Sequence, residues 1–271
     1  MTNHSKGTAL VTGASSGIGA IYADRLARRG YDIILVARNR ERLNAFAKRL
    51  TDETGRTVEV AVADLNDKAD VRRIETVLRT DASITLLVNN AGVGATAPLL
   101  EADVDKMDDM ISLNVSALTR LTYAAAPGFV QRGGGTIINI ASIVGIRPDI
   151  LNGVYGGTKA FVLAFSQSLR HELADKNVRI QAVCPGTTAT EFWGLAGMPL
   201  EHLPSEIVMT AEDMVDASLV GLDQGEFVTI PSLVDFGAWE AFEAAREKLT
   251  LADLSRSVVA PRYQAGKRAV A

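Results

Sequence analysis

The sequence predicts an α/β fold: one doubly wound, Rossmann-type domain with a mostly parallel sheet of about seven strands and helices on both faces. Short apolar, largely β-branched runs alternate with longer amphipathic segments along most of the 271 residues. This alternation is typical of repeated strand–helix–strand units. A glycine-rich turn also separates the first apolar run from the first amphipathic segment, as dinucleotide-binding domains require.

Each predicted strand is a short run that is nearly all apolar, as expected where helices cover both faces of a sheet. The predicted strands are Thr8–Val11, Ile33–Ala37, Val58–Val62, Thr85–Val88, Thr136–Ile140, Arg179–Val183 and Phe227–Ile230. Right-handed crossovers between parallel strands would bring their carboxyl ends to one edge of the sheet, where open α/β sheets bind ligands.

The amphipathic segments between these runs predict helices. Their ranges are Ile18–Arg29, Arg40–Glu53, Ala69–Arg79, Val104–Ala126, Val154–Ala174, Ala211–Leu222 and Phe236–Leu249. In the helix predicted at Val154–Ala174, Phe161, Phe165, Leu169 and Leu173 recur every four residues and form one apolar stripe.

We predict a single catalytic domain over residues 1–271, because no linker or change of composition divides the chain. Residues 187–222 begin with an irregular stretch that carries Phe192 and Trp193 among glycines and prolines. This composition suggests a lid or a wall that covers a pocket, and a satellite cluster packed on the main core is an equally weighted alternative. Residues 235–271 are predicted to form a C-terminal helix and a basic tail.

Composition excludes several classes of protein. The net charge of −4 lacks the basic footprint of a nucleic-acid-binding protein. One cysteine, Cys184, cannot form an internal disulfide. The amino terminus lacks the apolar segment of a secretory signal, and no stretch is long enough to span a membrane. We therefore expect a cytoplasmic protein with neither nucleic-acid nor membrane partners.

The glycine-rich turn runs from Thr12 to Gly19 and leads directly into a predicted helix. Glycines allow a sharp turn and a close approach to a ligand, and a helix N-terminus offers free N–H groups to a phosphate. A tight turn without a ligand is the alternative. The end of the second strand carries Arg38 where an acidic residue would select NAD(H). Its guanidinium suits a 2′-phosphate, which favours NADP(H), unless Arg38 is only a solvated strand-end residue.

Tyr155 and Lys159 are four residues apart in a predicted helix and therefore share one face. A nearby ammonium group would lower the pKa of the phenol from about 10 towards neutrality, as a proton donor to a carbonyl requires. Ser142 follows the preceding strand, where its hydroxyl could hold a substrate oxygen or merely cap a turn.

These motifs resemble, in order and spacing, the short-chain dehydrogenase/reductase family over residues 6–190. The resemblance rests on Thr12 to Gly19, Asp64, Asn89-Asn90-Ala91-Gly92, Asn114, Ser142, Tyr155, Lys159 and Pro185-Gly186. It implies that Tyr155 is the general acid or base, that Lys159 lowers its pKa and holds the nicotinamide ribose, and that Ser142 orients the substrate. It further implies that Asn114 holds a water, although satisfying local backbone is the alternative.

The resemblance and the motifs together define the expected cofactor site. Asp64 and Leu65 would lie at the adenine, with a helix or turn cap as the alternative for Asp64. Thr190 would contact the carboxamide, with Thr187 and Thr188 as competitors for that contact. The expected cofactor-binding residues are Gly13, Ser15, Ser16, Gly17, Ile18, Gly19, Arg38, Asp64, Leu65, Asn90, Ala91, Gly92, Tyr155, Lys159, Pro185, Gly186, Thr188 and Thr190.

The leading hypothesis is therefore an NADP(H)-dependent oxidoreductase acting on a carbonyl or secondary alcohol, with a catalytically silent NADP(H)-binding sensor or scaffold as the alternative. Three scattered histidines give no metal site. A mainly apolar substrate is expected from Val144, Ile146, Ile150, Leu151 and the segment Phe192–Leu203. Arg147 could bind a carboxylate, although a surface turn residue is favoured. The family resemblance implies a homodimer or homotetramer.

Overall fold

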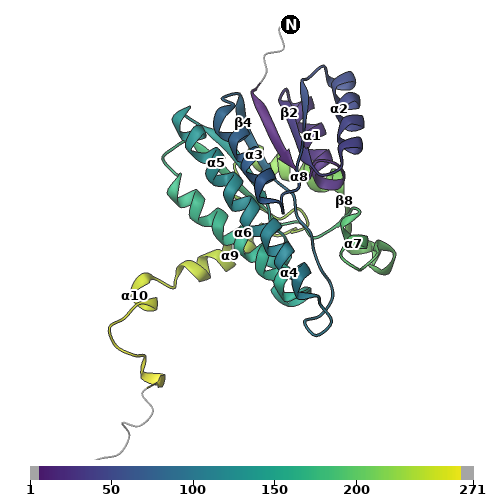
Figure 1. Ribbon diagram of the computed structural model, residues 1–271. Coiled ribbons are helices and arrows are strands. Elements are labelled where there is room, and N and C mark those ends of the chain that lie inside the picture. Colours follow the sequence, from purple (N-terminus) through teal and green to yellow (C-terminus); the bar gives the residue numbers. More distant parts are fainter. Residues whose placement is uncertain (1–5, 264–271) are drawn as a thin grey trace, which may run out of the picture. The chain divides into compact units, whose positions relative to one another are not determined.

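The computed structural model describes residues 6–263 and divides the chain into two compact units, Met1–Pro231 and Ser232–Ala271. The first unit contains the sheet and the glycine-rich turn (Figure 1). One domain over the whole chain stays a prediction. No helix within the described residues is long and apolar enough to cross a membrane.

The first unit is built on a seven-stranded sheet in the order β3-β2-β1-β4-β5-β6-β9, and every neighbouring pair is parallel. The predicted doubly wound α/β fold is confirmed. The last strand is shorter than predicted. The strands are β1 (Thr8–Thr12), β2 (Asp32–Ala37), β3 (Val58–Val62), β4 (Ile84–Asn89), β5 (Gly135–Ile140), β6 (Val178–Val183) and β9 (Val228–Thr229).

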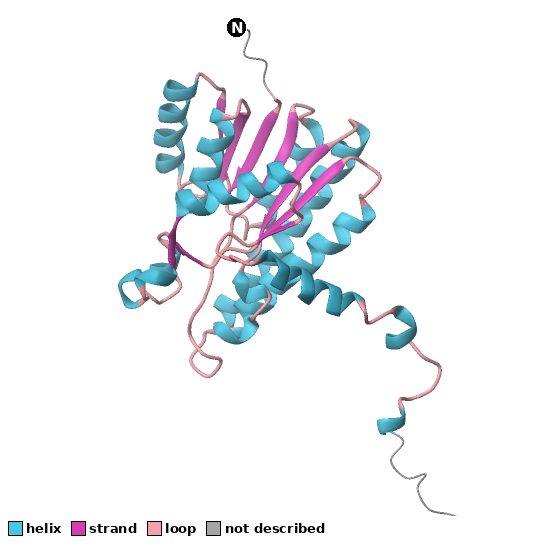
Figure 2. Ribbon diagram, turned by 180° about the vertical axis from the view of Figure 1, so that it is seen from behind, coloured by secondary structure: helices cyan, strands magenta, loops and turns pink. Residues whose placement is uncertain are grey.

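Helices cover both faces of this sheet (Figure 2). Successive residues of β1 point to opposite faces: Ala9 and Val11 belong to one buried cluster and Leu10 to the other. The first cluster also contains side chains of α1 (Gly17–Arg28), α2 (Arg40–Thr54) and α8 (Ala211–Gln224). The second contains those of α3 (Lys68–Thr80), α5 (Leu118–Gln131) and α6 (Gly153–Glu172).

Two predicted segments differ from the structure. The helix expected at Val104–Ala126 consists of α4 (Val104–Ile111), a π-helical stretch (Ser112–Ala117) and α5. The irregular part of the lid-like segment contains β7 (Thr187–Ala189), which pairs in parallel with β8 (Val208–Thr210), and a short helix α7 (Phe192–Leu195). Short 3₁₀ turns occupy Ile143–Gly145, Pro148–Ile150, Leu200–His202 and Ser205–Ile207.

The second unit contains α9 (Phe236–Glu247), α10 (Leu251–Leu254) and a 3₁₀ turn at Pro261–Tyr263. Asp235 caps α9 by accepting a bond from the Gly237 amide, and a capping box of Thr250 and Asp253 begins α10. The predicted helix Phe236–Leu249 thus ends two residues early. Most of the predicted basic tail lies outside the described residues.

Candidate active site

A cavity of about 480 Å³ opens at the carboxyl ends of the strands. It collects residues from the turns after β1, β4, β5 and β6 and from α6. Most of the predicted site residues line it, namely Gly13, Ser16, Gly17, Ile18, Asn90, Ala91, Gly92, Ser142, Tyr155, Lys159, Pro185, Gly186, Thr188 and Thr190. Six predicted residues do not: Ser15, Gly19, Arg38, Asp64, Leu65 and Asn114.

The turn requires glycine at three positions, either because of the backbone conformation or because a side chain would not fit. Gly13 and Gly17 have φ angles of +67° and +52°, which side chains rarely adopt. A Cβ on Gly19 would overlap the carbonyl oxygen of Gly13. The Ser16 side chain makes no capping bond at the start of α1. The turn therefore presents an uncapped helix N-terminus, which attracts anions, to the cavity.

Thr12 ties this turn to the loop after β4. Its hydroxyl donates to the Val88 carbonyl at 3.1 Å and accepts bonds from the amides of Asn90 and Ala91 at 2.9 and 3.0 Å. The Asn90 amide group donates to the Thr12 carbonyl at 2.9 Å. Two walls of the cavity are thereby held at a fixed distance.

Two predicted recognition residues lie outside the cavity. Arg38 is exposed at the end of β2, and among the described residues its side chain has no hydrogen-bond or ion-pair partner. Asp64 accepts a bond from the Asn66 amide at 3.0 Å, and its own amide donates to Asp70. Its carboxylate therefore makes the local turn that the alternative interpretation describes.

Tyr155 lies at the start of α6, where the Asn152 side chain accepts bonds from the amides of Val154 and Tyr155. The ring is buried. The Ser142 hydroxyl lines the same cavity, donates to the Pro185 carbonyl at 3.3 Å and accepts a bond from the Val144 amide at 3.3 Å. Burial raises the pKa of Tyr155 to about 12, although the Ser142 side chain acts to lower it. The phenol is therefore protonated at neutral pH.

Lys159 is also buried, and its Nζ donates to the Ile140 carbonyl at 2.8 Å. Burial lowers the pKa of this ammonium group from 10.5 to about 8. Nζ lies 5.9 Å from the centroid of the Tyr155 ring. The expectation that Lys159 brings the pKa of Tyr155 towards neutrality is wrong for this structure, because burial of the phenol raises its pKa and only Ser142 opposes that rise.

Asn114 lies in the π-helical stretch and is buried. Its side chain accepts a bond from the Val93 amide at 3.0 Å and donates to the Val93 carbonyl at 2.8 Å and to Thr158 at 3.1 Å. Asn114 thus joins the loop after β4 to α6, where its partner Thr158 directly precedes Lys159. The alternative role, satisfying local backbone, does not describe Asn114, because its backbone partner Val93 is distant in sequence.

The rest of the cavity is mainly apolar. Val144, Ile150, Leu151 and several side chains of α7 and its neighbours line it as predicted, whereas Ile146 does not. Arg147 forms a surface ion pair with Asp149 at 2.8 Å, which fits the surface-turn interpretation. Lining residues missed from the sequence are Val93, Gly94, Ile140, Ala141, Ile143, Glu191 and Ile207. Of these, Val93 and Gly94 directly follow Asn90 to Gly92, and this continuity could have identified them.

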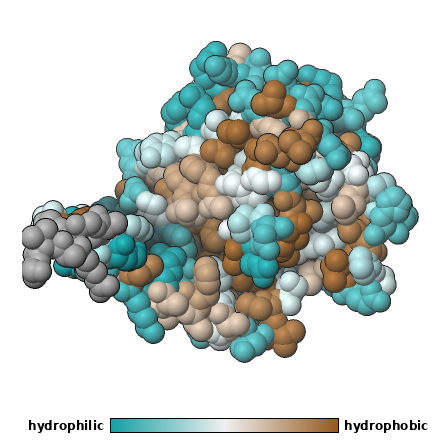
Figure 3. All heavy atoms as spheres, turned by 90° about the horizontal axis from the view of Figure 1, so that it is seen from below, coloured by the Kyte–Doolittle hydropathy of each residue, from teal (hydrophilic) through white to brown (hydrophobic). Residues whose placement is uncertain are grey.

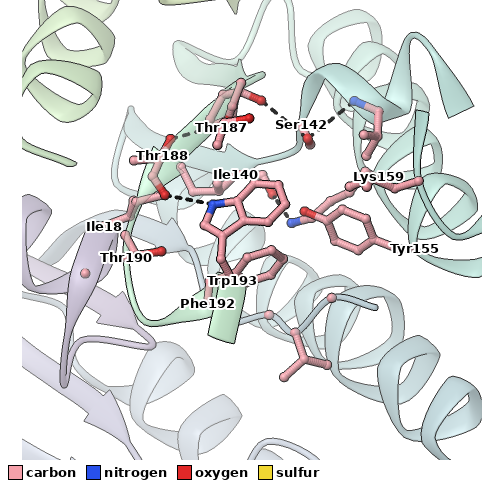
Figure 4. A pocket seen from close by; sticks show the side chains of 18 of the residues that line it. Ile18, Ile140, Ser142, Tyr155, Lys159, Thr187, Thr188, Thr190, Phe192 and Trp193 are labelled. Carbon is pink, nitrogen blue, oxygen red and sulfur yellow. Dashed lines mark hydrogen bonds between the residues drawn. The ribbon is translucent and has the colours of Figure 1, made fainter. Parts of the chain in front are cut away.

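Figure 4 shows the arrangement of these side chains. Ser142, Tyr155 and Lys159 lie on one side of the cavity, and the phenol points towards the side that holds Phe192 and Trp193. Within residues 6–263, no group of three or more His, Cys, Asp or Glu side chains could hold a metal ion.

The chain belongs to the short-chain dehydrogenase/reductase family, because the family described as short chain dehydrogenase matches residues 7–197. A short-chain dehydrogenase from Sphingobium yanoikuyae in complex with NADPH is 48% identical, with a TM-score of 0.91 over 95% of this chain and 100% of that one. A bulky-bulky ketone specific alcohol dehydrogenase from Comamonas testosteroni is 42% identical, with a TM-score of 0.88 over 96% and 100%.

Curated relatives are similar over shorter spans. A very-long-chain 3-oxoacyl-CoA reductase of Anas platyrhynchos is 38% identical over 189 residues, which is 68% of this chain and 60% of that protein. An NADP-dependent 3-hydroxy acid dehydrogenase of Shigella flexneri is 35% identical over 77% of this chain and 86% of its own length. The chain is thus an oxidoreductase of this family whose relatives act on C=O or CH–OH groups.

Proposed function

We propose that this enzyme transfers a hydride between NADP(H) and a ketone or secondary alcohol whose substituents are mainly apolar. The observation that carries the proposal is that Ser142, Tyr155 and Lys159 line the same cavity as the glycine-rich turn. The NADPH bound to the Sphingobium protein and the ketone specificity of the Comamonas protein support it.

The residues of the turn fit a dinucleotide. Gly13 and Gly17 have positive φ angles, Gly19 leaves no room for a side chain, and the uncapped start of α1 suits a diphosphate. At the end of β2, the exposed guanidinium of Arg38 suits a 2′-phosphate, and the sequence has no carboxylate at that position to accept bonds from a ribose 2′-hydroxyl. NADP(H) is therefore preferred to NAD(H).

When bound, the cofactor supplies or accepts the hydride. In reduction, the Tyr155 phenol donates its proton to the carbonyl oxygen as the hydride reaches the carbonyl carbon, and the product is an alcohol. Because burial keeps the pKa of Tyr155 high, the proton is present at neutral pH. In the same step Ser142 holds the oxygen in line with the phenol, and Lys159 supplies positive charge beside the ring.

The remaining roles are carried over from the family. Asp64 and Leu65 would lie at the adenine, Asn114 would hold a water that links Lys159 to solvent, and Thr190 would contact the carboxamide. The assembly is proposed to be a homodimer or homotetramer in the cytoplasm, in which reduction is the main direction.

The test is a purified-enzyme assay that follows nicotinamide absorbance with NADPH and a panel of phenyl ketones, aliphatic ketones and aldehydes. We expect oxidation of NADPH with apolar ketones and a lower kcat/KM with NADH. Tight NADPH binding without turnover of any carbonyl, or of any alcohol with NADP⁺, would contradict the proposal and indicate a silent binding protein.

A further inference from the structure

Phe192 is a wall of the cavity directly beside the proposed proton donor. The centroids of the Phe192 and Tyr155 rings lie 5.7 Å apart. Phe192 also packs against the small apolar cluster of Met110, Val144 and Tyr155. A carbonyl whose oxygen reaches the Tyr155 hydroxyl must therefore place one of its substituents next to the Phe192 ring (Figure 4).

The Phe192 ring packs directly against the backbone of Gly94, which we call the seat of the ring. A Cβ on Gly94 would overlap Phe192 Cζ. Gly94 is not among the glycines with positive φ, so its backbone is open to any residue and the missing side chain serves the ring. Phe192 thus fills the space that a side chain at position 94 would otherwise occupy.

A second aromatic side chain blocks the ring from another direction. Trp193 meets Phe192 edge to face, with centroids 5.6 Å apart and an interplanar angle of 85°. Trp193 is itself buried, and its Nε1 donates to the Thr188 carbonyl at 2.9 Å. The ring of Phe192 therefore has a fixed neighbour on that side.

The loop that carries Gly94 is also fastened to the segment that carries Phe192. The amide and the hydroxyl of Thr96 both donate to the Ala196 carbonyl, at 3.1 and 2.9 Å. These two bonds therefore fix the loop of Gly94 relative to the segment of Phe192, so that the two do not move independently. Three other lining residues, Ile150, Leu195 and Ile207, are 50%, 83% and 55% exposed, so the cavity opens to solvent beside them.

We infer that Phe192, held in place by Gly94, is a specificity-determining residue that limits how far one substituent of the carbonyl extends beside Tyr155. The inference rests on the proposed function. The second substituent extends towards the exposed lining residues Ile150, Leu195 and Ile207. Figure 3 shows that hydrophobic side chains lie among hydrophilic ones on the face seen from below. The cavity thus has a space of fixed size for one substituent of the carbonyl and an open space for the other.

The test compares phenyl ketones that differ only in alkyl length, from acetophenone to valerophenone, with NADPH. In Phe192→Ala, we expect the ratio of kcat/KM for valerophenone to that for acetophenone to rise about tenfold, since space for added methylene groups is worth about that much. KM for NADPH should not change. Phe192→Leu should give an intermediate ratio and guards against misfolding of the alanine variant.

A double-variant cycle tests the role of the seat. Gly94→Ala pushes the ring into the cavity and should lower the same ratio, whereas Gly94→Ala in the Phe192→Ala background should have no effect, because no ring remains to be displaced. Leu100→Ala, in the same loop and 96% exposed, is the matched control.

The outcomes separate the two proposals. If the wild-type enzyme reduces the series and every variant shows the same ratio of kcat/KM as the wild type, the inference is overturned and the proposed function stays intact. Equal effects of Gly94→Ala with and without Phe192 also overturn it. A wild-type enzyme that reduces aliphatic ketones but no member of the phenyl series overturns the inference and leaves the proposed function intact. Absence of turnover with every carbonyl and alcohol of the wider panel removes the proposed function, and the inference with it.

Discussion

Two groups of residues are proposed to contact the same cofactor, but the active-site side chains are buried whereas the arginines after β2 are exposed to solvent. Tyr155 and Lys159 are buried, and their pKa values are shifted in opposite directions by that burial. Arg38 and Arg40 are exposed. Interactions are strong where water is excluded and screened where it is not. Buried residues should therefore control turnover by large factors, and exposed residues should control cofactor choice by small ones.

The largest effect is expected for Tyr155→Phe. This change removes the hydroxyl and keeps the buried ring, so the proton donor is lost without a cavity. Turnover of a ketone should fall by a factor of about 10² to 10⁴. The check is steady-state kinetics with NADPH. Tyr123→Phe, which alters an exposed tyrosine on α5, is the matched control.

The second effect concerns Lys159 and pH. Because the pKa of Lys159 is about 8, its ammonium is charged below that pH and neutral above it. Reduction should therefore slow as pH rises through about 8. In Lys159→Arg the charge persists, and the decline should move to higher pH. An unchanged inflection in that variant would assign it to another group.

A smaller effect is expected for Arg38→Ala. Loss of a guanidinium from an exposed phosphate site should raise KM for NADPH about tenfold and leave KM for NADH almost unchanged. Lys48→Ala is the matched control, since Lys48 is an exposed cation of α2 paired with Asp52. Equal losses for both cofactors would show that Arg38 does not read the 2′-phosphate.

The smallest effect is expected for the ion pair between Arg42 of α2 and Glu191 beside α7. The charged atoms lie 2.7 Å apart, but both side chains are at least half exposed, so the pair is screened. Arg42→Ala and Glu191→Ala should each change KM for the ketone by no more than about fivefold. The charge-swapped double variant should restore part of the loss, and a double variant worse than both would argue against a direct interaction.

Much of the fold and the centre of the site follow from local sequence signals. The turn from Thr12 to Gly19 and the Tyr155–Lys159 pair are each contained within a few residues of a strand or helix. Their spacing was sufficient to predict that they share one edge of the sheet. In the structure the turn, Tyr155 and Lys159 line one cavity at the carboxyl ends of the strands.

The parts that were missed depend on contacts distant in sequence. Thr187 pairs with Val208 across the lid-like segment, and strands of three residues leave no periodic signal. The π-helical stretch keeps the apolar spacing of a helix, so its Asn114 bonds to Val93 could not be read from periodicity. The direction of the Tyr155 pKa shift depends on burial, which only the folded chain defines.

The comparison is tested most directly by measuring, for Tyr155→Phe and Arg38→Ala together, the Kd for NADPH and the turnover of a ketone at saturating NADPH. We expect opposite results for the two variants. Tyr155→Phe should bind NADPH as the wild type does and lose turnover, whereas Arg38→Ala should bind NADPH weakly and keep its turnover once saturated. Near wild-type turnover in Tyr155→Phe would contradict the assignment of the proton donor.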